Sequence, residues 1–213
     1  SAHHSRSITT GLIKAMENND VQVIAIIPAR YKSNRFPGKP LASINGKPMI
    51  QHVVERAQKV ALLSRVVVAT DDTRIADCVD GFGGDYVMTR DDHVSGTDRL
   101  AEAAQLLDVS AHDIVVNIQG DQPLFHSEII NQVTQPLLDD PDLPMSTLIY
   151  KIIRAEEIED PNHVKTVFDR DHNALYFSRS AIPHQRNPED GTPTYYKHLG
   201  VYGYRKNFLL TFV

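Results

Sequence analysis

The sequence predicts an α/β domain built on a doubly wound, mainly parallel sheet. Short apolar runs rich in Val and Ile recur at "VQVIAII" (21–27), "RVVVAT" (65–70) and "DIVVNIQ" (113–119). Runs of this length and composition are typical of strands that are buried on both faces, as in a parallel sheet. Helix-like segments separate the runs, and this alternation predicts right-handed crossovers between parallel strands.

Three helices are predicted in this part of the chain. The segment 48–60 opens with a proline, which suits the first turn of a helix. The segment 71–84 opens with carboxylates and ends on glycines, which are start and stop signals. The segment 95–107 begins with capping residues and then carries Leu and Ala at helical spacing.

The pattern changes in the last third of the chain. The change begins at 143–152, and three further strands are predicted after it, at 163–169, 174–180 and 197–205. The turn-forming sequences "DRDHN" and "NPEDGTP" lie between some of them. We interpret this part as an extension of the sheet that completes a pocket.

Composition limits the class of protein. The chain has 213 residues, 41% of them hydrophobic, which is enough for one sizeable domain. We interpret residues 1–20 as a tag remnant or an N-terminal extension and residues 21–213 as a single domain. The 27 acidic and 22 basic residues give a net charge of −5, which argues against a nucleic-acid-binding protein.

The single cysteine, Cys78, allows no intrachain disulfide and favours a cytoplasmic location, and we expect it in the core. No apolar run approaches the roughly 20 residues needed to cross a bilayer, so no membrane association is expected.

Four cations gather directly behind the first predicted strand, in "IIPARYKSNRFPGKPLA" (26–42). They are Arg30, Lys32, Arg35 and Lys39. Ligands of open α/β sheets bind outside the carboxyl ends of the strands, where this segment begins. Arg binds phosphate oxygens in pairs and Lys adds a point charge, so a triphosphate is the expected partner. The alternative is a solvated basic loop, which is disfavoured because prolines and a glycine restrict the segment. The segment matches neither the Walker P-loop pattern nor the G-x-G-x-x-G pattern.

Two more motifs lie at predicted strand or helix ends. Asp121 follows a glycine just after the run 113–119, where a carboxylate suits Mg²⁺ held jointly by protein and phosphates. The alternative is an Asp that tightens a turn. The segment "DDHVSGTDR" (91–99) leads into a helix whose first amides can hold an anion or a base edge, and an ordinary capped helix is an equal alternative.

Two ring side chains late in the chain, His198 and Tyr202, are an even number of residues apart. If this segment is a strand, both side chains point to the same face. No two histidines have the spacing of metal ligands, and His52 is expected to be a packing residue on a helix.

Seven segments occur in a fixed order along the chain: "IIPARYKSNRFPGKPL", "VATDD", "SGTDR", "NIQGDQP", "HVKTVFD", "ALYFSRSAIP" and "KHLGVYGYR". Together they resemble the 3-deoxy-manno-octulosonate (Kdo) cytidylyltransferase family, over roughly residues 22–213. The resemblance implies a Rossmann-like fold of the nucleotide-diphospho-sugar transferase type. It also implies the reaction CTP + Kdo → CMP-Kdo + pyrophosphate, which serves lipopolysaccharide biosynthesis in Gram-negative bacteria. Mg²⁺ as cofactor, CTP and a 3-deoxy-octulosonic acid as partners, and a homodimer are implied as well.

Carried over position by position, the resemblance implies three groups of site residues. The nucleotide would be held by Arg30, Ser33, Arg35, Lys39, Ser95, Gly96 and Gln119. The catalytic residues would be Arg35, Lys39 and Asp121, with Asp121 as the Mg²⁺ ligand. The sugar acid would lie against Arg179, His198 and Tyr202, because its carboxylate needs a cation or hydrogen-bond donors.

Departures from the family leave alternatives open. The family commonly has Glu where this chain has Gln122, so the leading alternative is a cytidylyltransferase for the 8-amino-3,8-dideoxy analogue of Kdo. The family continues past the position of Val213 to a second metal-binding Asp, so we expect the domain to lack its C-terminal segment. CMP-sialic acid synthetases share the fold and chemistry. A non-catalytic nucleotide-binding protein is the alternative from another class, and pyrophosphate release distinguishes it from an enzyme.

Overall fold

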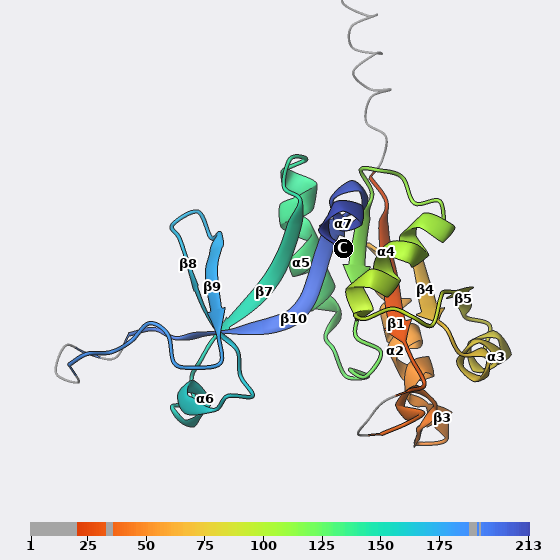
Figure 1. Ribbon diagram of the computed structural model, residues 1–213, viewed down its shortest axis with the longest axis horizontal. Helices are drawn as coiled ribbons and strands as arrows, with labels where there is room; N and C mark the ends of the chain where they lie inside the picture. The colour runs from red at the N-terminus through yellow and green to blue at the C-terminus, as the bar shows by residue number, and fades with distance from the viewer. Residues whose placement is uncertain (1–20, 33–35, 188–190, 192) are drawn as a thin grey trace, which may run out of the picture.

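The computed structural model describes residues 21–32, 36–187, 191 and 193–213 of the chain. At its centre lies one eight-stranded sheet, with the strand order β5-β4-β1-β6-β10-β8-β9 and with β7 paired to β10 (Figure 1). Helices cover both faces of the first half of this sheet. The Rossmann-like α/β fold predicted from the sequence is therefore confirmed.

The first half of the sheet is parallel. β4 (Arg65–Thr70) lies between β5 (Asp85–Met88) and β1 (Val23–Ala29), and β6 (Ile114–Asn117) follows on the other side of β1. The three Val- and Ile-rich runs thus form the buried strands β1, β4 and β6, as predicted. β5 was not predicted, because it is short and mostly exposed and so lacks a long apolar run.

The second half of the sheet is antiparallel. β10 (Tyr196–Arg205) pairs with β6 along one edge and with β7 (Met145–Lys151) along the other. β8 (Lys165–Phe168) pairs with the first residues of β10 and with β9 (Ala174–Ser178). The three strands expected in this part of the chain are present as β8, β9 and β10, and β7 lies in the segment 143–152 where the sequence pattern changes. Figure 1 shows that β8 and β9 project away from the helix-covered half of the molecule.

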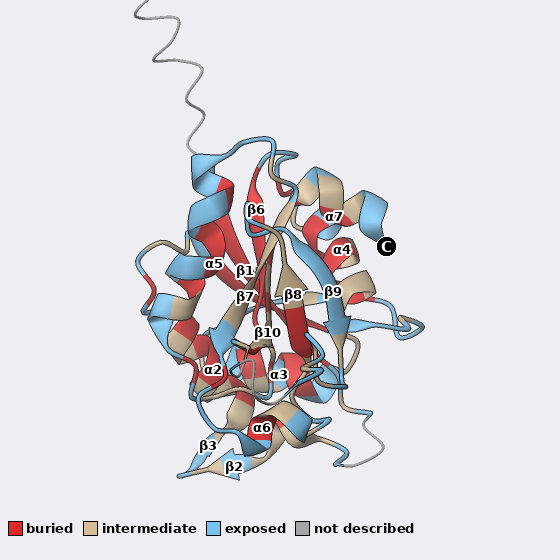
Figure 2. Ribbon diagram, turned by 90° about the vertical axis from the view of Figure 1, so that its left-hand side faces the viewer, coloured by how far each residue is buried: buried red, intermediate tan, exposed pale blue. Residues whose placement is uncertain are grey.

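Alternate residues of β1 point into two separate cores, as expected of a central strand. One core contains Ala25 and Ile27 and lies under three helices, α2 (Met49–Ala57), α3 (Thr73–Gly81) and α5 (Ser127–Asp139). The other contains Ile24 and Ile26 and lies under α4 (Gly96–Leu106) and α7 (Lys206–Phe212). Figure 2 shows these buried residues where strands and helices meet in the middle of the molecule.

The predicted helices at 48–60, 71–84 and 95–107 correspond to α2, α3 and α4. α5 was not predicted, although its buried residues Ile130, Val133 and Leu137 follow helical spacing. Cys78 of α3 is partly buried and packs against the first core, where burial raises the pKa of its thiol.

Short elements carry the chain from β1 to α2. They are the 3-10 helix η1 (Lys39–Leu41) and a hairpin of β2 (Ser43–Ile44) and β3 (Lys47–Pro48). His52 of α2 fixes this hairpin, because its Nε2 lies 2.7 Å from the Ile44 carbonyl oxygen. A short helix, α6 (Glu156–Glu159), follows β7.

Arg205 at the end of β10 ties the two halves of the sheet together. Its buried guanidinium donates to the carbonyl oxygens of His112 at 2.9 Å and Asp140 at 3.0 Å, and also to that of Leu137. Two of these carbonyls belong to the carboxyl end of α5, where unpaired C=O groups need donors. β10 is thereby held against both α5 and the loop before β6.

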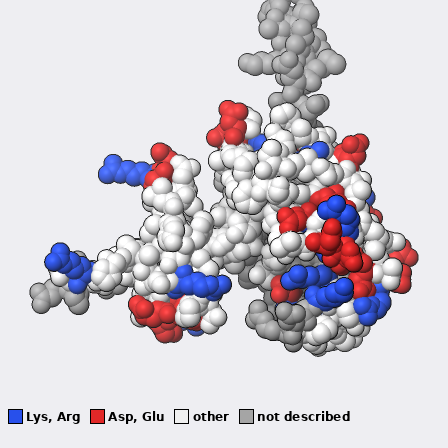
Figure 3. Space-filling view, in the orientation of Figure 1, with Lys and Arg blue, Asp and Glu red and all other residues white. Residues whose placement is uncertain are grey.

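Charges of both signs are interspersed over the part of the molecule that contains β4, β5, α3 and α4 (Figure 3). The surface along β7 and β10 carries few charges in the same view. Among the described residues, no helix combines the length and apolar character needed to cross a membrane.

Candidate active site

A cavity of about 440 Å³ opens at the carboxyl ends of β1 and β6, which are neighbours in the sheet. We name it the β1–β6 cavity. It is lined by Pro28, Ala29, Arg30, Phe36, Lys39, Pro40, Gln119, Gly120 and Asp121. The cationic segment and the "NIQGDQP" segment therefore meet at one place, as the carboxyl-end argument predicts.

Lys39 and Asp121, which both line this cavity, form an ion pair. The Lys39 Nζ lies 2.8 Å from an Asp121 carboxylate oxygen, and the two side chains are 38% and 52% exposed. An exposed pair of this kind adds little to stability. The ion pair matters because it brings together an ammonium and a carboxylate that lie 82 residues apart in the sequence.

Of the other residues predicted in the cationic segment, only some can be placed relative to the cavity. Arg30 lines the cavity and is exposed, and Lys32 is also exposed. Ser33 and Arg35 lie outside the described residues. Their assignment to the nucleotide therefore stays a prediction.

Gly38 shapes the loop that presents Lys39. Its φ of +71° is unfavourable for other residues, and its N–H donates to the Tyr31 carbonyl oxygen at 2.8 Å. A Cβ at this position would lie 2.9 Å from the Tyr31 ring. The Arg74 guanidinium packs on this ring, 3.3 Å from its centroid, so a shift of the ring would disturb that contact.

We expect Gly38→Ala to lower the free energy of unfolding by about 2 kcal/mol, since strained backbone and a ring clash add together. Gly46→Ala is the matched control, because Gly46 has a φ of +82° but no atom lies within 4 Å of the place that its Cβ would take. Thermal unfolding of both variants tests the difference. Equal losses in the two variants would mean that the Tyr31 contact is unimportant.

The first turn of α4 lies over the end of β1. A Cβ on Gly96 would lie 3.7 Å from the Pro28 ring, so this turn borders the cavity wall. Ser95 caps the helix: its hydroxyl accepts from the Asp98 N–H at 3.1 Å, and its own N–H donates to the Asp98 carboxylate at 2.8 Å. Hydrogen bonding of Ser95 to the Asp98 carboxylate lowers the pKa of Asp98. Capping is thus present, and contact with the nucleotide stays a prediction for both Ser95 and Gly96.

Arg99, one turn further along α4, was not recognised from the sequence as a site residue. It is only 4% exposed and donates to the Thr89 hydroxyl at 2.5 Å and to the Arg90 carbonyl at 3.3 Å. It also pairs with the Asp71 carboxylate at 3.1 Å. Arg99 therefore fixes the ends of β4 and β5 against α4. The sequence signal was its place in "SGTDR", but its burial depends on the fold.

His198 and Tyr202 lie side by side, with ring centroids 5.3 Å apart. They are opposite Ile149 and Thr147 of β7, only two positions apart, because β10 carries two extra residues in a bulge between Leu199 and Tyr202. The same-face prediction is therefore confirmed. The His198 Nε2 lies 2.9 Å from the Thr147 hydroxyl. Burial lowers the pKa of His198, which favours its neutral form, and raises the pKa of Tyr202.

Arg179 follows the end of β9 and is not joined to this pair by a direct contact. Its guanidinium donates to the Pro161 carbonyl oxygen at 2.7 Å. Phe177, two residues earlier, does contact His198, with ring centroids 4.9 Å apart. The role of Arg179 in binding the sugar acid therefore stays a prediction.

Glu157 lies buried between two cations next to this part of the site. Its carboxylate accepts from Lys197 Nζ at 2.6 Å and from Arg154 Nε at 2.8 Å. The bond from Lys197, followed by that from Arg154, lowers the pKa of Glu157 from 4.5 to about 2. Glu157 thus anchors the residue that precedes His198.

This depressed pKa predicts a pH dependence of stability. The ionised carboxylate contributes fully above the unfolded-state pKa of 4.5, and the contribution is lost as the pH falls toward about 2. We expect Glu157→Gln to flatten the decline in free energy of unfolding across this window. Denaturant unfolding at several pH values measures the slope, with the exposed neighbour variant Glu156→Gln as control. Parallel slopes for Glu157→Gln and the unchanged protein would contradict the assignment.

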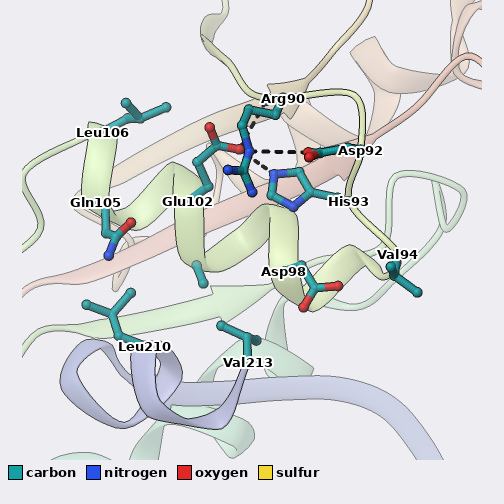
Figure 4. A pocket seen from close by; sticks show the side chains of 11 residues that line it. Arg90, Asp92, His93, Val94, Asp98, Glu102, Gln105, Leu106, Leu210 and Val213 are labelled. Atoms are coloured by element: carbon teal, nitrogen blue, oxygen red, sulfur yellow. Dashed lines mark hydrogen bonds and ion pairs between the residues drawn. The ribbon is translucent and has the colours of Figure 1, made fainter.

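A second, larger cavity of about 650 Å³ lies between α4, the segment after β5 and α7 (Figure 4). Arg90 pairs with Asp92 at 3.2 Å on its wall, and His93 contacts Glu102. None of the predicted site residues lines this cavity. The β1–β6 cavity is the better candidate site, since the cations and the carboxylate that the sequence analysis assigns to phosphate and metal meet there.

The described residues include no group of three or more His, Cys, Asp or Glu side chains arranged to hold a metal ion. Mg²⁺ does not need such a group, because it is usually bound through one or two carboxylates together with substrate phosphates. Asp121, exposed beside the cations Lys39 and Arg30, fits this mode of binding.

Comparisons with known proteins agree with this geometry. A family model described as "Cytidylyltransferase" matches residues 24–213. The chain is 59% identical to a 3-deoxy-manno-octulosonate cytidylyltransferase of Syntrophus aciditrophicus, over 90% of this chain and 77% of the relative. It is 54% identical to an 8-amino-3,8-dideoxy-manno-octulosonate cytidylyltransferase of Shewanella frigidimarina, over 90% and 78% of the two chains.

A solved structure supports the same relationship. The structure of a CMP:2-keto-3-deoxy-manno-octonic acid synthetase complexed with CTP superposes with a TM-score of 0.83 and 48% identity, covering 90% of this chain and 77% of the other. These matches confirm the resemblance seen in the motifs, and the chain belongs to the cytidylyltransferase family.

Proposed function

We propose that this protein transfers the cytidylyl group of CTP to Kdo, giving CMP-Kdo and pyrophosphate for lipopolysaccharide biosynthesis. The observation that carries the proposal is the 59% identity to a cytidylyltransferase for this sugar acid, over 90% of the chain. The β1–β6 cavity supports the proposal, because it is lined by Arg30, Lys39 and Asp121 at the carboxyl edge of the sheet.

The chemistry is an in-line displacement at phosphorus. The anomeric hydroxyl of the sugar forms a bond to the α-phosphorus, the bond from that phosphorus to pyrophosphate breaks, and the hydroxyl proton is released. The protein contributes by positioning the reactants and neutralising charge. Arg30, Arg35 and Lys39 would bind the phosphates, and Lys39 would stabilise the departing pyrophosphate. No covalent enzyme intermediate is required.

Asp121 would be the protein ligand of Mg²⁺. When bound there with the phosphates, the ion would neutralise phosphate charge and lower the pKa of the attacking hydroxyl. Lys39 must release the Asp121 carboxylate for this to happen, and the triphosphate offers the ammonium a replacement anion.

The sugar acid would lie on β10 beside His198 and Tyr202. Neutral His198, held by Thr147, can exchange hydrogen bonds with sugar hydroxyls. Ser95, Gly96 and Gln119 would surround the nucleotide, and Arg179 would have to leave the Pro161 carbonyl to reach the sugar carboxylate.

A second candidate is the 8-amino-3,8-dideoxy analogue of Kdo, favoured by the 54% identity to a cytidylyltransferase for that sugar and by Gln122. The test is pyrophosphate release from CTP and Mg²⁺ with Kdo, its 8-amino analogue or sialic acid as acceptor. Preference for Kdo supports the first proposal, and preference for the amino sugar replaces it with the second. CTP binding without pyrophosphate release would contradict both.

We also propose a homodimer in the cytoplasm. Large apolar side chains around β7 to β9 are exposed, among them Ile153 at 87%, Leu175 at 64% and Tyr176 at 65%. Exposed apolar surface of this kind favours association with another chain. Light scattering of the purified protein tests the stoichiometry, and a monomer at micromolar concentration would contradict it.

A further inference from the structure

Asn117, the last residue of β6, is buried, and its side-chain oxygen has no hydrogen-bond partner among the described residues. It is 4% exposed, and its side-chain oxygen is shielded from solvent. Buried polar side chains are nearly always paired, because an unpaired one costs stability. The free protein therefore tolerates a cost at this position.

Along β6, Asn117 lies between the core and the β1–β6 cavity. Val115, two residues earlier, packs in the core under α4, and Gln119, two residues later, lines the cavity. Ile118 between them points into the opposite core, so the alternation continues past the end of the strand. Side chains two positions apart share a face at a spacing of about 7 Å. Asn117 is thus the first polar side chain behind the cavity wall.

Across the sheet, Asn117 borders the predicted sugar site. It lies opposite Tyr202 in β10, and Tyr202 lies opposite Thr147 in β7. Residues opposite each other in register share one face. The three side chains therefore form a polar row, which Thr147 extends to His198 through the 2.9 Å contact.

Helix α4 packs beside this row. Leu100 of α4 packs in the same core as Tyr204, whose ring stacks on that of Tyr202 with the centroids 5.8 Å apart. Asn117 consequently lies where three parts meet: the cavity, α4 and the His198–Tyr202 pair.

We propose that Asn117 is a substrate-binding residue, whose amide pairs with a hydroxyl group where the nucleotide and the sugar acid meet. The inference rests on the proposed function. An amide both donates and accepts, as a hydroxyl does. Because no hydrogen bond from the described residues holds the amide oxygen, the amide can turn about its terminal torsion toward a ligand. The ribose of CTP and the sugar acid are the two sources of such a hydroxyl.

Asn117→Leu tests the proposal, because it keeps the size of the side chain and removes both polar atoms. We expect kcat/KM to fall by about tenfold to a hundredfold, since the ligand hydroxyl loses its partner. In the absence of substrates, Tm should stay the same or rise, because an unpaired buried group has been removed. A residue with a merely structural role would lower Tm and leave the kinetic constants unchanged. An unchanged kcat/KM in a folded Asn117→Leu protein overturns the proposal. If Asn117→Leu does not fold, the variant Asn117→Ser is used in the same assay.

Deoxynucleotides distinguish the two sources of the hydroxyl. If the partner is a ribose hydroxyl, 2′- or 3′-deoxy-CTP should lower kcat/KM for the unchanged protein. The same deoxynucleotide should not lower kcat/KM for Asn117→Leu any further. If the partner belongs to the sugar acid, the two losses should multiply and the KM for the sugar acid should rise. Both results support a binding role.

Thr134→Val is the control, because the Thr134 hydroxyl is buried in α5 and donates to the Ile130 carbonyl at 2.7 Å within its own helix. Its kinetic constants should match those of the unchanged protein. Pyrophosphate release by the unchanged protein is measured in parallel. If the unchanged protein releases pyrophosphate and Asn117→Leu releases it at the same rate, the role of Asn117 is overturned. The proposed function then still stands.

Discussion

Asp121→Asn is expected to lower kcat by about a thousandfold while changing the affinity for CTP by less than about tenfold. A neutral amide is a weaker ligand for Mg²⁺ than a carboxylate, so the charge developing during phosphoryl transfer loses its main compensation. The phosphates keep their cations, because Lys39 and Arg30 are unchanged and Lys39 is freed from its ion pair. Pyrophosphate release at saturating CTP measures the first quantity, and calorimetric titration with CTP measures the second.

Asp85→Asn is the matched control for this variant. Asp85 also forms an exposed ion pair, with Arg65 at 3.1 Å, but it lies on the edge strand β5 and outside the cavity lining. Its kcat should equal that of the unchanged protein. Near-normal turnover by Asp121→Asn would refute the metal assignment.

The strands of the parallel half were predictable because each carries its own signal. β1, β4 and β6 are buried on both faces, so continuous apolar runs mark them. β5 carries no such run, because it is short and largely exposed at the edge of the sheet. Its place is decided by pairing with β4, which is a tertiary contact.

The candidate site was predictable to the extent that it depends on strand ends. Lys39 and Asp121 follow β1 and β6, and parallel neighbours bring their carboxyl ends together. Arg99 and Asn117 could not be found in this way. The burial of Arg99 depends on the packing of α4 against β4 and β5, and the place of Asn117 beside Tyr202 depends on the register between β6 and β10.

Lys39→Met is expected to lower kcat/KM for CTP by about a hundredfold, because a charge-assisted contact with the phosphates is lost both in binding and as pyrophosphate departs. The half-saturating Mg²⁺ concentration should not rise, since the variant no longer has an ammonium competing for the Asp121 carboxylate. The free energy of unfolding should change by less than about 1 kcal/mol, because the ion pair is exposed. Steady-state kinetics over a Mg²⁺ series and denaturant unfolding measure these three quantities.

Lys47→Met controls for the loss of an exposed lysine, because Lys47 pairs with Glu55 at 2.8 Å away from the cavity lining. Lys39→Arg keeps the positive charge and should restore part of the lost kcat/KM. A Lys39→Met protein that loses stability but keeps its kinetic constants would place Lys39 in the scaffold. Loss of kcat/KM at constant stability, with partial rescue by Arg, instead requires an anion that meets the Lys39 ammonium during turnover, and the triphosphate is the anion that this reaction supplies.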